Sequence, residues 1–393
     1  MRRIGIIMGR LVLACTLGAS AQAAPLPLDT DHEAFDTAVR GAVTPEVAQS
    51  LASLKVLHLS ADHGRWLDTG LVTQAGQPVT WLLSGRVYWS RALALWLPPQ
   101  LALWGQLGEG GTIFNGARPT HTFVADRAAP LRLRLYPDGA WTSPNGQSVG
   151  EPAPVNPDAG GGVSVALLAW KPGTDVAAQM SALARNARLA PWAAAESARL
   201  AEGEHRPPAG WNDLWELGRN DIFRRVPEGR GSAIELATHG DVGILQKDAA
   251  IALRPGTRLS WAWRLDSLPS PQPEASIPTH DYLSIAVEFD DGRDLTFLWS
   301  QGLPVGQVFA CPLPAWKDRE THVVQRSGAA GLGEWHDESV DLYAAVRRAY
   351  GDHLPQRVVR VWIIANSLFQ RGAGRGRFAR IALEGNGERV AVE

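Results

Sequence analysis

Apolar and polar residues alternate along three runs in the second half of the chain. The runs lie at residues 259–265, 283–289 and 295–299, and each places every second residue on one apolar face. Such alternation, bounded by Gly, Pro and Asp, is typical of half-buried antiparallel strands. The pair Asp291-Gly292 between the last two runs is a hairpin signal. The pattern therefore predicts a β-meander whose apolar face is rich in tryptophan.

Similar alternation occurs on both sides of a helical stretch. Further strands are predicted at residues 57–60, 64–71, 79–89, 120–125, 131–136, 162–170, 321–327, 357–365 and 378–384. Apolar residues instead recur at helical spacing within 24–55 and 173–209, and Pro207-Pro208 marks the end of the second stretch. We therefore expect a mainly β chain. Two β-sandwich domains, at 56–172 and 210–393, are preceded by short N-terminal helices (24–55) and joined by a helical connector (173–209).

The N-terminus has the pattern of a secretory signal. A basic Met-Arg-Arg start precedes an apolar stretch at 4–19 and an Ala-x-Ala pattern at 21–23. We expect residues 1–23 to be a signal peptide and the protein to be exported to the periplasm or beyond. Residues 12–15 loosely match a lipoprotein signal, which leaves a lipoprotein as the lesser alternative. No later run of about 18 apolar residues occurs, so no transmembrane segment is predicted.

Composition narrows the choice of partners. The 393 residues carry a formal net charge of −2 without a basic run, which argues against nucleic acid. Sixteen tryptophans against five tyrosines is unusual. An exposed indole can stack on a sugar ring, whereas a buried one fills a sandwich core. We take Trp261, Trp263, Trp299 and Trp335 as carbohydrate-binding candidates, with core filling as the alternative.

Short glycine-centred pieces of the first β domain fall in a recognisable order. They are Trp66-Leu-Asp-Thr-Gly70, Gly76-Gln-Pro-Val-Thr80, Gly108-Glu-Gly-Gly111 and Gly160-Gly-Gly-Val-Ser-Val165. Together they resemble the galactose-binding-like sandwich of soluble galactophilic bacterial lectins. In those lectins the corresponding loop holds a calcium ion that coordinates sugar hydroxyls. The resemblance implies calcium at Asp138, Thr142, Asn145 and Asp158, and the alternative is a long polar turn.

A second resemblance covers roughly residues 259–383. It rests on pieces in order and at matching spacing, among them Leu259-Ser-Trp-Ala-Trp-Arg264, His280-Asp-Tyr282, Phe297-Leu-Trp-Ser300 and Tyr350-Gly351. These pieces resemble the secreted bacterial domain-of-unknown-function family 3047. The resemblance implies a jelly-roll-like sandwich, as in many carbohydrate-binding modules, and no known activity.

Candidate catalytic groups are carboxylates of the second domain: Asp281, Glu288, Glu338 and Asp341. A glycoside hydrolase needs one protonated and one ionised acid about 5–9 Å apart. The alternative is that these acids are solvated on outer faces or lie at a helix start. The ten histidines show no metal-binding spacing, so calcium is the one candidate cofactor.

We therefore expect an exported glycan-binding or envelope-associated protein without catalytic activity. It would bind a carbohydrate or another cell-envelope component through exposed aromatic rings. A first alternative is a polysaccharide-active enzyme, a hydrolase or lyase that uses the carboxylates above. A second alternative is a structural envelope adaptor that binds another protein.

Overall fold

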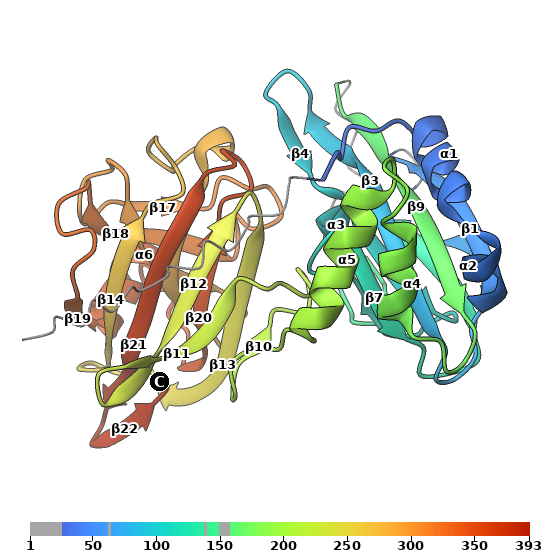
Figure 1. Ribbon diagram of the computed structural model, residues 1–393. Coiled ribbons are helices and arrows are strands. Elements are labelled where there is room, and N and C mark those ends of the chain that lie inside the picture. Colours follow the sequence, from blue (N-terminus) through green and yellow to red (C-terminus); the bar gives the residue numbers. More distant parts are fainter. Residues whose placement is uncertain (1–25, 62–63, 137–139, 149–157) are drawn as a thin grey trace, which may run out of the picture.

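The computed structural model describes residues 26–61, 64–136, 140–148 and 158–393. It confirms a mainly β chain with two β-sandwich domains, which lie side by side in Figure 1. The predicted signal peptide lies outside the described residues. Among the helices of the described segments, none is long and apolar enough to cross a bilayer.

The first domain pairs a five-stranded sheet with a four-stranded sheet. The larger sheet has the order β1-β9-β3-β4 with β7 beside β3, and the smaller has the order β2-β8-β5-β6. Its elements are β1 (Leu51–Ser60), β2 (Leu67–Val72), β3 (Pro78–Ser90), β4 (Leu95–Leu97), α3 (Pro99–Ala102), β5 (Leu103–Leu107), β6 (Ile113–Phe114), β7 (Thr120–Val124), β8 (Pro130–Leu135) and β9 (Gly160–Trp170). Trp81 of β3 and Val165 of β9 point into the core between the sheets.

Four helices cover the outer face of the five-stranded sheet. They are α1 (His32–Ala42), α2 (Pro45–Ser50), α4 (Val176–Leu183) and α5 (Ala190–Glu202). Residues of β9 that point away from the sandwich core, such as Leu168 and Trp170, pack against Phe35 of α1 and Trp192 of α5. Figure 1 shows the helices on this face of the sheet. The predicted connector is therefore also a third layer of the first domain.

The boundary between the N-terminal helices and the first strand differs from the prediction. The apolar stripe suggested helix up to Leu54, but α2 ends at Ser50 and β1 begins at Leu51. Here the backbone pairs with β9, from Leu51 opposite Trp170 onward. The backbone N–H and C=O groups that a longer α2 would pair within the helix are paired with β9 instead. The side chain of Leu54 still packs in the hydrophobic cluster between the helices and the five-stranded sheet.

The second domain is a larger sandwich. One sheet has the order β10-β13-β20-β15-β16-β18-β17, and the other has the order β11-β12-β21-β14-β19 with β22 beside β21. Every neighbouring pair is antiparallel except β16 with β18. The elements are β10 (Asn212–Asp213), β11 (Phe223–Glu228), β12 (Gly231–His239), β13 (Val242–Ala252), β14 (Arg258–Ser267), η1 (Ile277–Thr279), β15 (Tyr282–Phe289), β16 (Asp294–Ser300), β17 (Val308–Ala310), β18 (Glu320–Ser327), β19 (His336–Asp341), α6 (Leu342–Tyr350), β20 (Arg357–Asn366), β21 (Ala373–Gly385) and β22 (Glu388–Ala391).

The three alternating runs do form strands, but they do not form one meander. β15 and β16 make the expected hairpin, with Ile285 opposite Phe297. β14 instead lies in the other sheet, between β21 and β19. The loop that follows β14 crosses from one sheet to the other, so the apolar faces of the three strands meet across the core. Alternation identified the buried face of each strand but not which strand lies beside it.

The two domains are in direct contact. Phe369, from the loop after β20, packs against the core of the first domain and lies 6.1 Å from the Trp89 ring. The guanidinium of Arg371 lies 3.4 Å from the centre of the Trp96 ring. Asn115 donates a hydrogen bond to the carbonyl oxygen of Leu217 at 3.1 Å. These contacts hold the two domains together, and residues from both of them and from the chain between them line a cleft.

Candidate ligand-binding cleft

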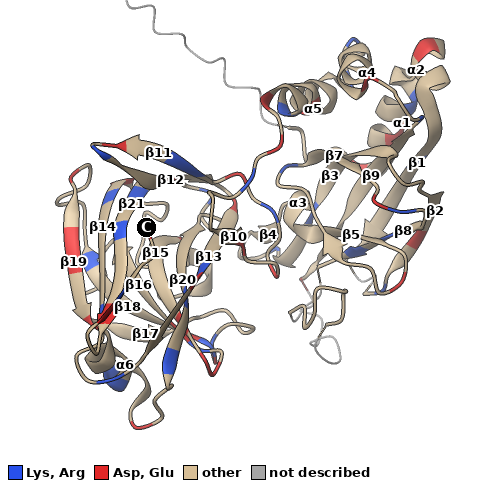
Figure 2. Ribbon diagram, turned by 90° about the horizontal axis from the view of Figure 1, so that it is seen from below, with Lys and Arg blue, Asp and Glu red and all other residues tan. Residues whose placement is uncertain are grey.

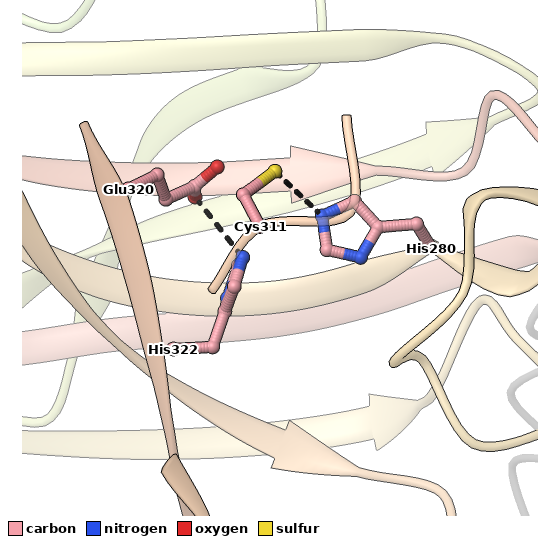
Figure 3. Close-up of side chains that lie close together, drawn as sticks. All are labelled: His280, Cys311, Glu320 and His322. Atoms are coloured by element: carbon pink, nitrogen blue, oxygen red, sulfur yellow. Dashed lines mark hydrogen bonds and ion pairs between the residues drawn. The ribbon is translucent and has the colours of Figure 1, made fainter. Parts of the chain in front are cut away.

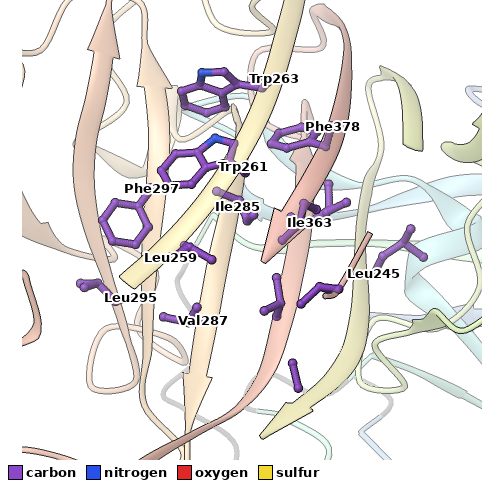
Figure 4. Close-up of a cluster of buried hydrophobic side chains, with 14 of the residues drawn as sticks. Leu245, Leu259, Trp261, Trp263, Ile285, Val287, Leu295, Phe297, Ile363 and Phe378 are labelled. Carbon is purple, nitrogen blue, oxygen red and sulfur yellow. The ribbon is translucent and has the colours of Figure 1, made fainter. Parts of the chain in front are cut away.

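Three of the four tryptophans predicted to bind carbohydrate belong to the core of the second domain. The exposed fractions of Trp261, Trp263 and Trp299 are 1%, 0% and 1%. Figure 4 shows Trp261 and Trp263 between the sheets, close to Phe297 and Phe378. The prediction that these rings bind sugar is wrong, because the opposite sheet covers the face on which they lie.

The indole nitrogens of Trp263 and Trp299 support a structural role. Trp263 Nε1 donates to a carboxylate oxygen of Glu338 at 3.2 Å. Trp299 Nε1 donates to the carbonyl oxygen of Gly328 at 2.9 Å. The fourth candidate, Trp335, is only half-buried and lies 5.6 Å from the guanidinium of Arg380. A role for Trp335 in binding sugar stays a prediction.

Two candidate catalytic carboxylates, one just before β15 and one within it, are bound within the fold. Asp281 is fully buried and accepts hydrogen bonds from the backbone of Phe369 and Gln370 at 2.8 and 2.6 Å. Burial raises the pKa of Asp281 to about 6. Glu288 pairs with Arg360 at 2.8 Å. Asp281 and Glu288 are seven positions apart along an extended strand, or about 23 Å, too far for a hydrolase pair.

The other two candidate carboxylates lie at the edge of the opposite sheet. Glu338 in β19 pairs with Arg326 at 2.5 Å and accepts from Gln325 at 2.7 Å. Asp341 is the N-cap of α6 and accepts from the backbone of Ala344 at 2.9 Å. Each of the four carboxylates therefore has a structural partner. Asp341 lies at a helix start, as the alternative expected, but Glu288 and Glu338 are paired with arginine and Asp281 is buried, so these three are not solvated on outer faces.

The calcium prediction stays open. Asp138 lies outside the described residues. The Asp158 carboxylate accepts from Ser90 Oγ at 2.8 Å and from the backbone of Ala92 at 2.9 Å, which holds the turn after β3. The Asn145 side chain accepts from Ser143 within its own loop. Calcium at these positions stays a prediction.

A cleft of about 590 Å³ opens where the two domains meet. The end of α5 contributes Arg199 and Glu202, and the following chain contributes residues 203–206 and Pro208. The second domain adds residues 219–221 and 223–225, and the first domain adds Arg118 and His121. Figure 2 shows blue and red segments along the chain that joins the domains.

Arginine is the commonest residue of the lining. Six arginines face three carboxylates there: Arg118, Arg199, Arg206, Arg219, Arg224 and Arg225 against Glu202, Glu204 and Asp221. Glu196 and Glu393, outside the lining, pair with Arg199 and Arg225, so the arginines still outnumber the carboxylates by one. We call these residues the arginine cleft.

Ion pairs hold several guanidinium groups in place. Arg118 bridges Glu202 at 2.8 Å and Asp221 at 2.5 Å, and so links the domains. Glu204 binds Arg219 at 2.7 Å and Arg206 at 3.2 Å. A guanidinium fixed in this way loses less conformational entropy when it binds a ligand.

Arg224 and Arg225 sit on β11 at the edge of its sheet, and both are exposed. Arg225 is anchored by the side chain of Glu393 at 2.6 Å. Burial, together with the charges of Arg199 and Arg219, lowers the pKa of His121 to about 3. His121 is therefore neutral at physiological pH, and the positive charge of the cleft comes from arginine.

Sequence reasoning missed the cleft because its residues come from separated segments. The available signal was local. It consisted of Glu202-Gly-Glu-His-Arg206, in the stretch that we treated only as a connector, and of Arg219-Asn-Asp221, near the start of the second domain. A second group of side chains, with the donor atoms that a metal ion would need, lies inside the second domain.

A comparison with protein families finds a match in the second domain. Residues 209–382 match the family described as "Protein of unknown function (DUF3047)", which confirms the resemblance drawn from the sequence. No curated protein is similar enough in sequence to be matched.

Several solved structures are distantly similar. The xyloglucanase domain of NopAA from Sinorhizobium fredii is 10% identical, with a TM-score of 0.27, and covers 45% of this chain and 93% of its own. The family 30 carbohydrate-binding module of a Clostridium thermocellum cellulase is 8% identical, with a TM-score of 0.26, and covers 47% and 96%. The tandem CBM22 domains of Paenibacillus barcinonensis Xyn10C are 8% identical, with a TM-score of 0.22, and cover 86% and 92%. Similarity at this level carries no argument about ligand or activity.

Proposed function

We propose that the protein is an exported binding protein for an acidic carbohydrate, which lies in the arginine cleft and leaves it unchanged. The observation that carries the proposal is the convergence of six arginines, from both domains and the chain between them, on one cleft of about 590 Å³. Ligand sites in proteins typically measure about 300–1,000 Å³. The cleft therefore has room for a few sugar residues.

The charge of the cleft favours an acidic ligand. A guanidinium binds a carboxylate or sulfate through two parallel hydrogen bonds, and such charge-assisted bonds are stronger than neutral ones. Arg224 and Arg225 are exposed on β11, so a ligand can reach them without displacing a buried contact. The cleft also holds acceptors for sugar hydroxyls, in the carboxylates of Glu202 and Glu204.

Stacking on an indole is not the basis of this binding. The one phenyl ring in the lining, that of Phe223, is fully buried. A neutral sugar would therefore find hydrogen bonds but no exposed aromatic face in the cleft. Because charge supplies the attraction, the affinity for an acidic saccharide falls as salt concentration rises.

Catalysis is not part of the proposal. The carboxylates named as catalytic candidates each have a structural partner, as described above. In the cleft, Glu202 and Asp221 are tied to Arg118, and Glu204 is tied to Arg206 and Arg219. The hydrogen bond to Arg219, with a further one to Arg206, lowers the pKa of the Glu204 carboxyl, which is therefore a poor proton donor.

The test is calorimetric titration with a uronic-acid trisaccharide and with its neutral counterpart of equal length. We expect binding of the acidic sugar alone, weaker at high salt. Arg224→Ala should weaken binding about tenfold, the value of one charge-assisted hydrogen bond. Arg188→Ala removes an equally exposed arginine between α4 and α5, outside the cleft, and serves as the matched control.

Three results would contradict the proposal. The first is equal affinity for the neutral and the acidic trisaccharide. The second is unchanged affinity in Arg224→Ala. The third is the release of new reducing ends from an acidic polysaccharide, which would support the enzymatic alternative. If no saccharide binds at all, the adaptor alternative gains support.

A further inference from the structure

Four side chains with metal-binding atoms meet inside the second domain. They are His280, Cys311, Glu320 and His322, and all four are buried. One donor atom from each lies within 4.8 Å of every other. Figure 3 shows the side chains turned toward one another from different segments. None of them belongs to the arginine cleft.

The fold brings these residues together on the outer side of the seven-stranded sheet. Glu320 and His322 are two positions apart in β18, so they share a face of the sheet. Cys311 follows β17, the strand paired with β18, and its backbone N–H donates to the carbonyl of Glu320 at 3.0 Å. His280 comes from the turn between η1 and β15.

His280 is oriented as a metal ligand would be. Its Nδ1 lies 2.8 Å from the carbonyl oxygen of Glu274. A carbonyl only accepts, so Nδ1 carries the hydrogen and Nε2 keeps its lone pair. Nε2 points at Cys311 Sγ, 3.4 Å away. Histidines that bind metals almost always donate the other ring N–H to such an acceptor.

Glu320 is oriented by a similar outer contact. The hydroxyl of Tyr282 donates to Glu320 Oε1 at 2.8 Å, and Thr296 Oγ1 donates to the same oxygen at 3.3 Å. Both donors are themselves buried, so they hold the Glu320 carboxylate in one orientation within the cluster. Outer contacts of this kind position a metal-binding carboxylate.

The unsatisfied ring nitrogens of His322 independently indicate that a ligand binds at this cluster. Its side chain is fully buried, and neither ring nitrogen makes a hydrogen bond to any described residue. Nε2 lies 3.6 Å from Glu320 Oε1, beyond hydrogen-bond distance. Phe309 stacks on the ring at 4.9 Å and His280 meets it edge-on at 4.9 Å, so the ring is held facing the other donors. Buried polar atoms without partners are rare in folded proteins.

We propose that His280, Cys311, Glu320 and His322 bind one zinc-class divalent metal ion in a closed, structural site. Two imidazole nitrogens, a thiolate and a carboxylate oxygen are a donor set that Zn²⁺ accepts. At zinc–ligand distances of about 2.0–2.3 Å, tetrahedral donors lie about 3.3–3.8 Å apart. The present spacing needs only a small contraction to reach this geometry. With four protein ligands and complete burial, the ion supports the fold and meets no substrate.

The site would also stabilise the contact between domains. Ile277, beside His280, and Leu313, beside Cys311, pack against the core of the first domain. The ring of Phe369, from the same contact, lies 6.4 Å from that of His280. A metal ion would tie the segments that carry these residues to β18. The proposal does not depend on the arginine cleft, because a saccharide can bind there whether or not the ion is present.

The test uses the full chain in a Cys15→Ser background, so that Cys311 is the one thiol. Protein is refolded with a chelator and then titrated with Co²⁺, whose thiolate charge-transfer absorption reports a sulfur ligand. Metal content after refolding with Zn²⁺ is measured by mass spectrometry. We expect about one ion per chain, a saturating thiolate band and a raised Tm.

Two variants and a control complete the test. Cys311→Ser should lose the thiolate band, and Glu320→Gln should bind Co²⁺ at least about tenfold more weakly while it keeps an oxygen for Tyr282. His353→Ala removes an exposed histidine outside the cluster and should behave as the wild type. The proposal is overturned if the wild type binds no stoichiometric metal, if bound Co²⁺ shows no thiolate band, or if Cys311→Ser keeps that band. Since Glu320→Gln retains the thiol, it tests the site even where Cys311→Ser fails to fold.

Discussion

Replacing Trp263 by alanine separates a core tryptophan from a ligand-binding one. Trp263 is fully buried among Trp261, Trp299 and Phe378, with ring centres 5.6–5.9 Å apart. A buried tryptophan removes about 150–250 Å² from water, worth about 4–6 kcal/mol at 25 cal/mol per Å². Alanine still buries its own methyl group, and the neighbouring side chains relax into part of the space that the ring leaves. We therefore expect the free energy of unfolding to fall by about 3–5 kcal/mol.

The assay measures the free energy of unfolding of the second domain in urea, with circular dichroism as the signal for unfolding. Trp335→Ala is the control, because Trp335 is half-buried and its contact with Arg380 is worth only about 0.5–1 kcal/mol. Trp263→Phe keeps a ring in the core but loses the bond to Glu338, and should cost about 1–2 kcal/mol. The reasoning is refuted if Trp263→Ala leaves stability unchanged and weakens saccharide binding instead.

Three further predictions address the domain contact, the buried donors and the cleft. Asn115→Ala removes the side-chain oxygen that accepts a hydrogen bond from the backbone N–H of Arg219 at 2.8 Å. We therefore expect the free energy of unfolding to fall by about 1–3 kcal/mol and the connector to be cleaved faster by a protease. An unchanged rate of cleavage would contradict this. Tyr282→Phe removes the donor to Glu320 and should lower metal affinity about 10–100-fold with little change in secondary structure, measured by Co²⁺ titration. The pKa of His121 is lowered to about 3, below its unfolded value near 6.5, so its stabilising contribution is complete above pH about 6.5 and is lost as pH falls toward 3. In His121→Gln the loss of stability between pH 7 and 4 should be smaller by up to about 3 kcal/mol, and an unchanged pH profile of unfolding would argue against this assignment.

Many of the strands could be predicted from the sequence. Residues 79–89 and 357–365 lie within β3 and β20, because alternating apolar residues correspond to a face packed against a core. The short strands β4, β5, β6, β10, β17 and β22 were missed, because they hold too few residues to show a period and owe their structure to pairing with neighbours. The strands β11, β12, β13 and β19 were missed as well, although β12 and β13 span nine and eleven residues.

Alternation could not show what covers a strand. In β15 the residues between the core positions, such as Ser284 and Ala286, are also buried. Phe309 and Trp316 form part of the cover over that face of the sheet. A run of alternating residues looks the same whether its second face meets water or another segment, so the exposure of the tryptophans could not be read from it.

The two candidate sites are tertiary features. Arg118 and Arg224 meet only because the connector brings β11 next to the first domain. His280 and Cys311 are 31 positions apart and match no metal-binding motif. Only Glu320-Thr-His322, with two donors at alternate positions at the start of the strand predicted from residue 321, carried a local signal.

The arginine cleft is tested most directly by a crystal structure with a uronic-acid trisaccharide bound. We expect the sugar to lie between β11 and the end of α5, with a carboxylate within hydrogen-bond distance of Arg224 or Arg225. A trisaccharide found elsewhere on the surface, with the cleft holding only solvent, would contradict it.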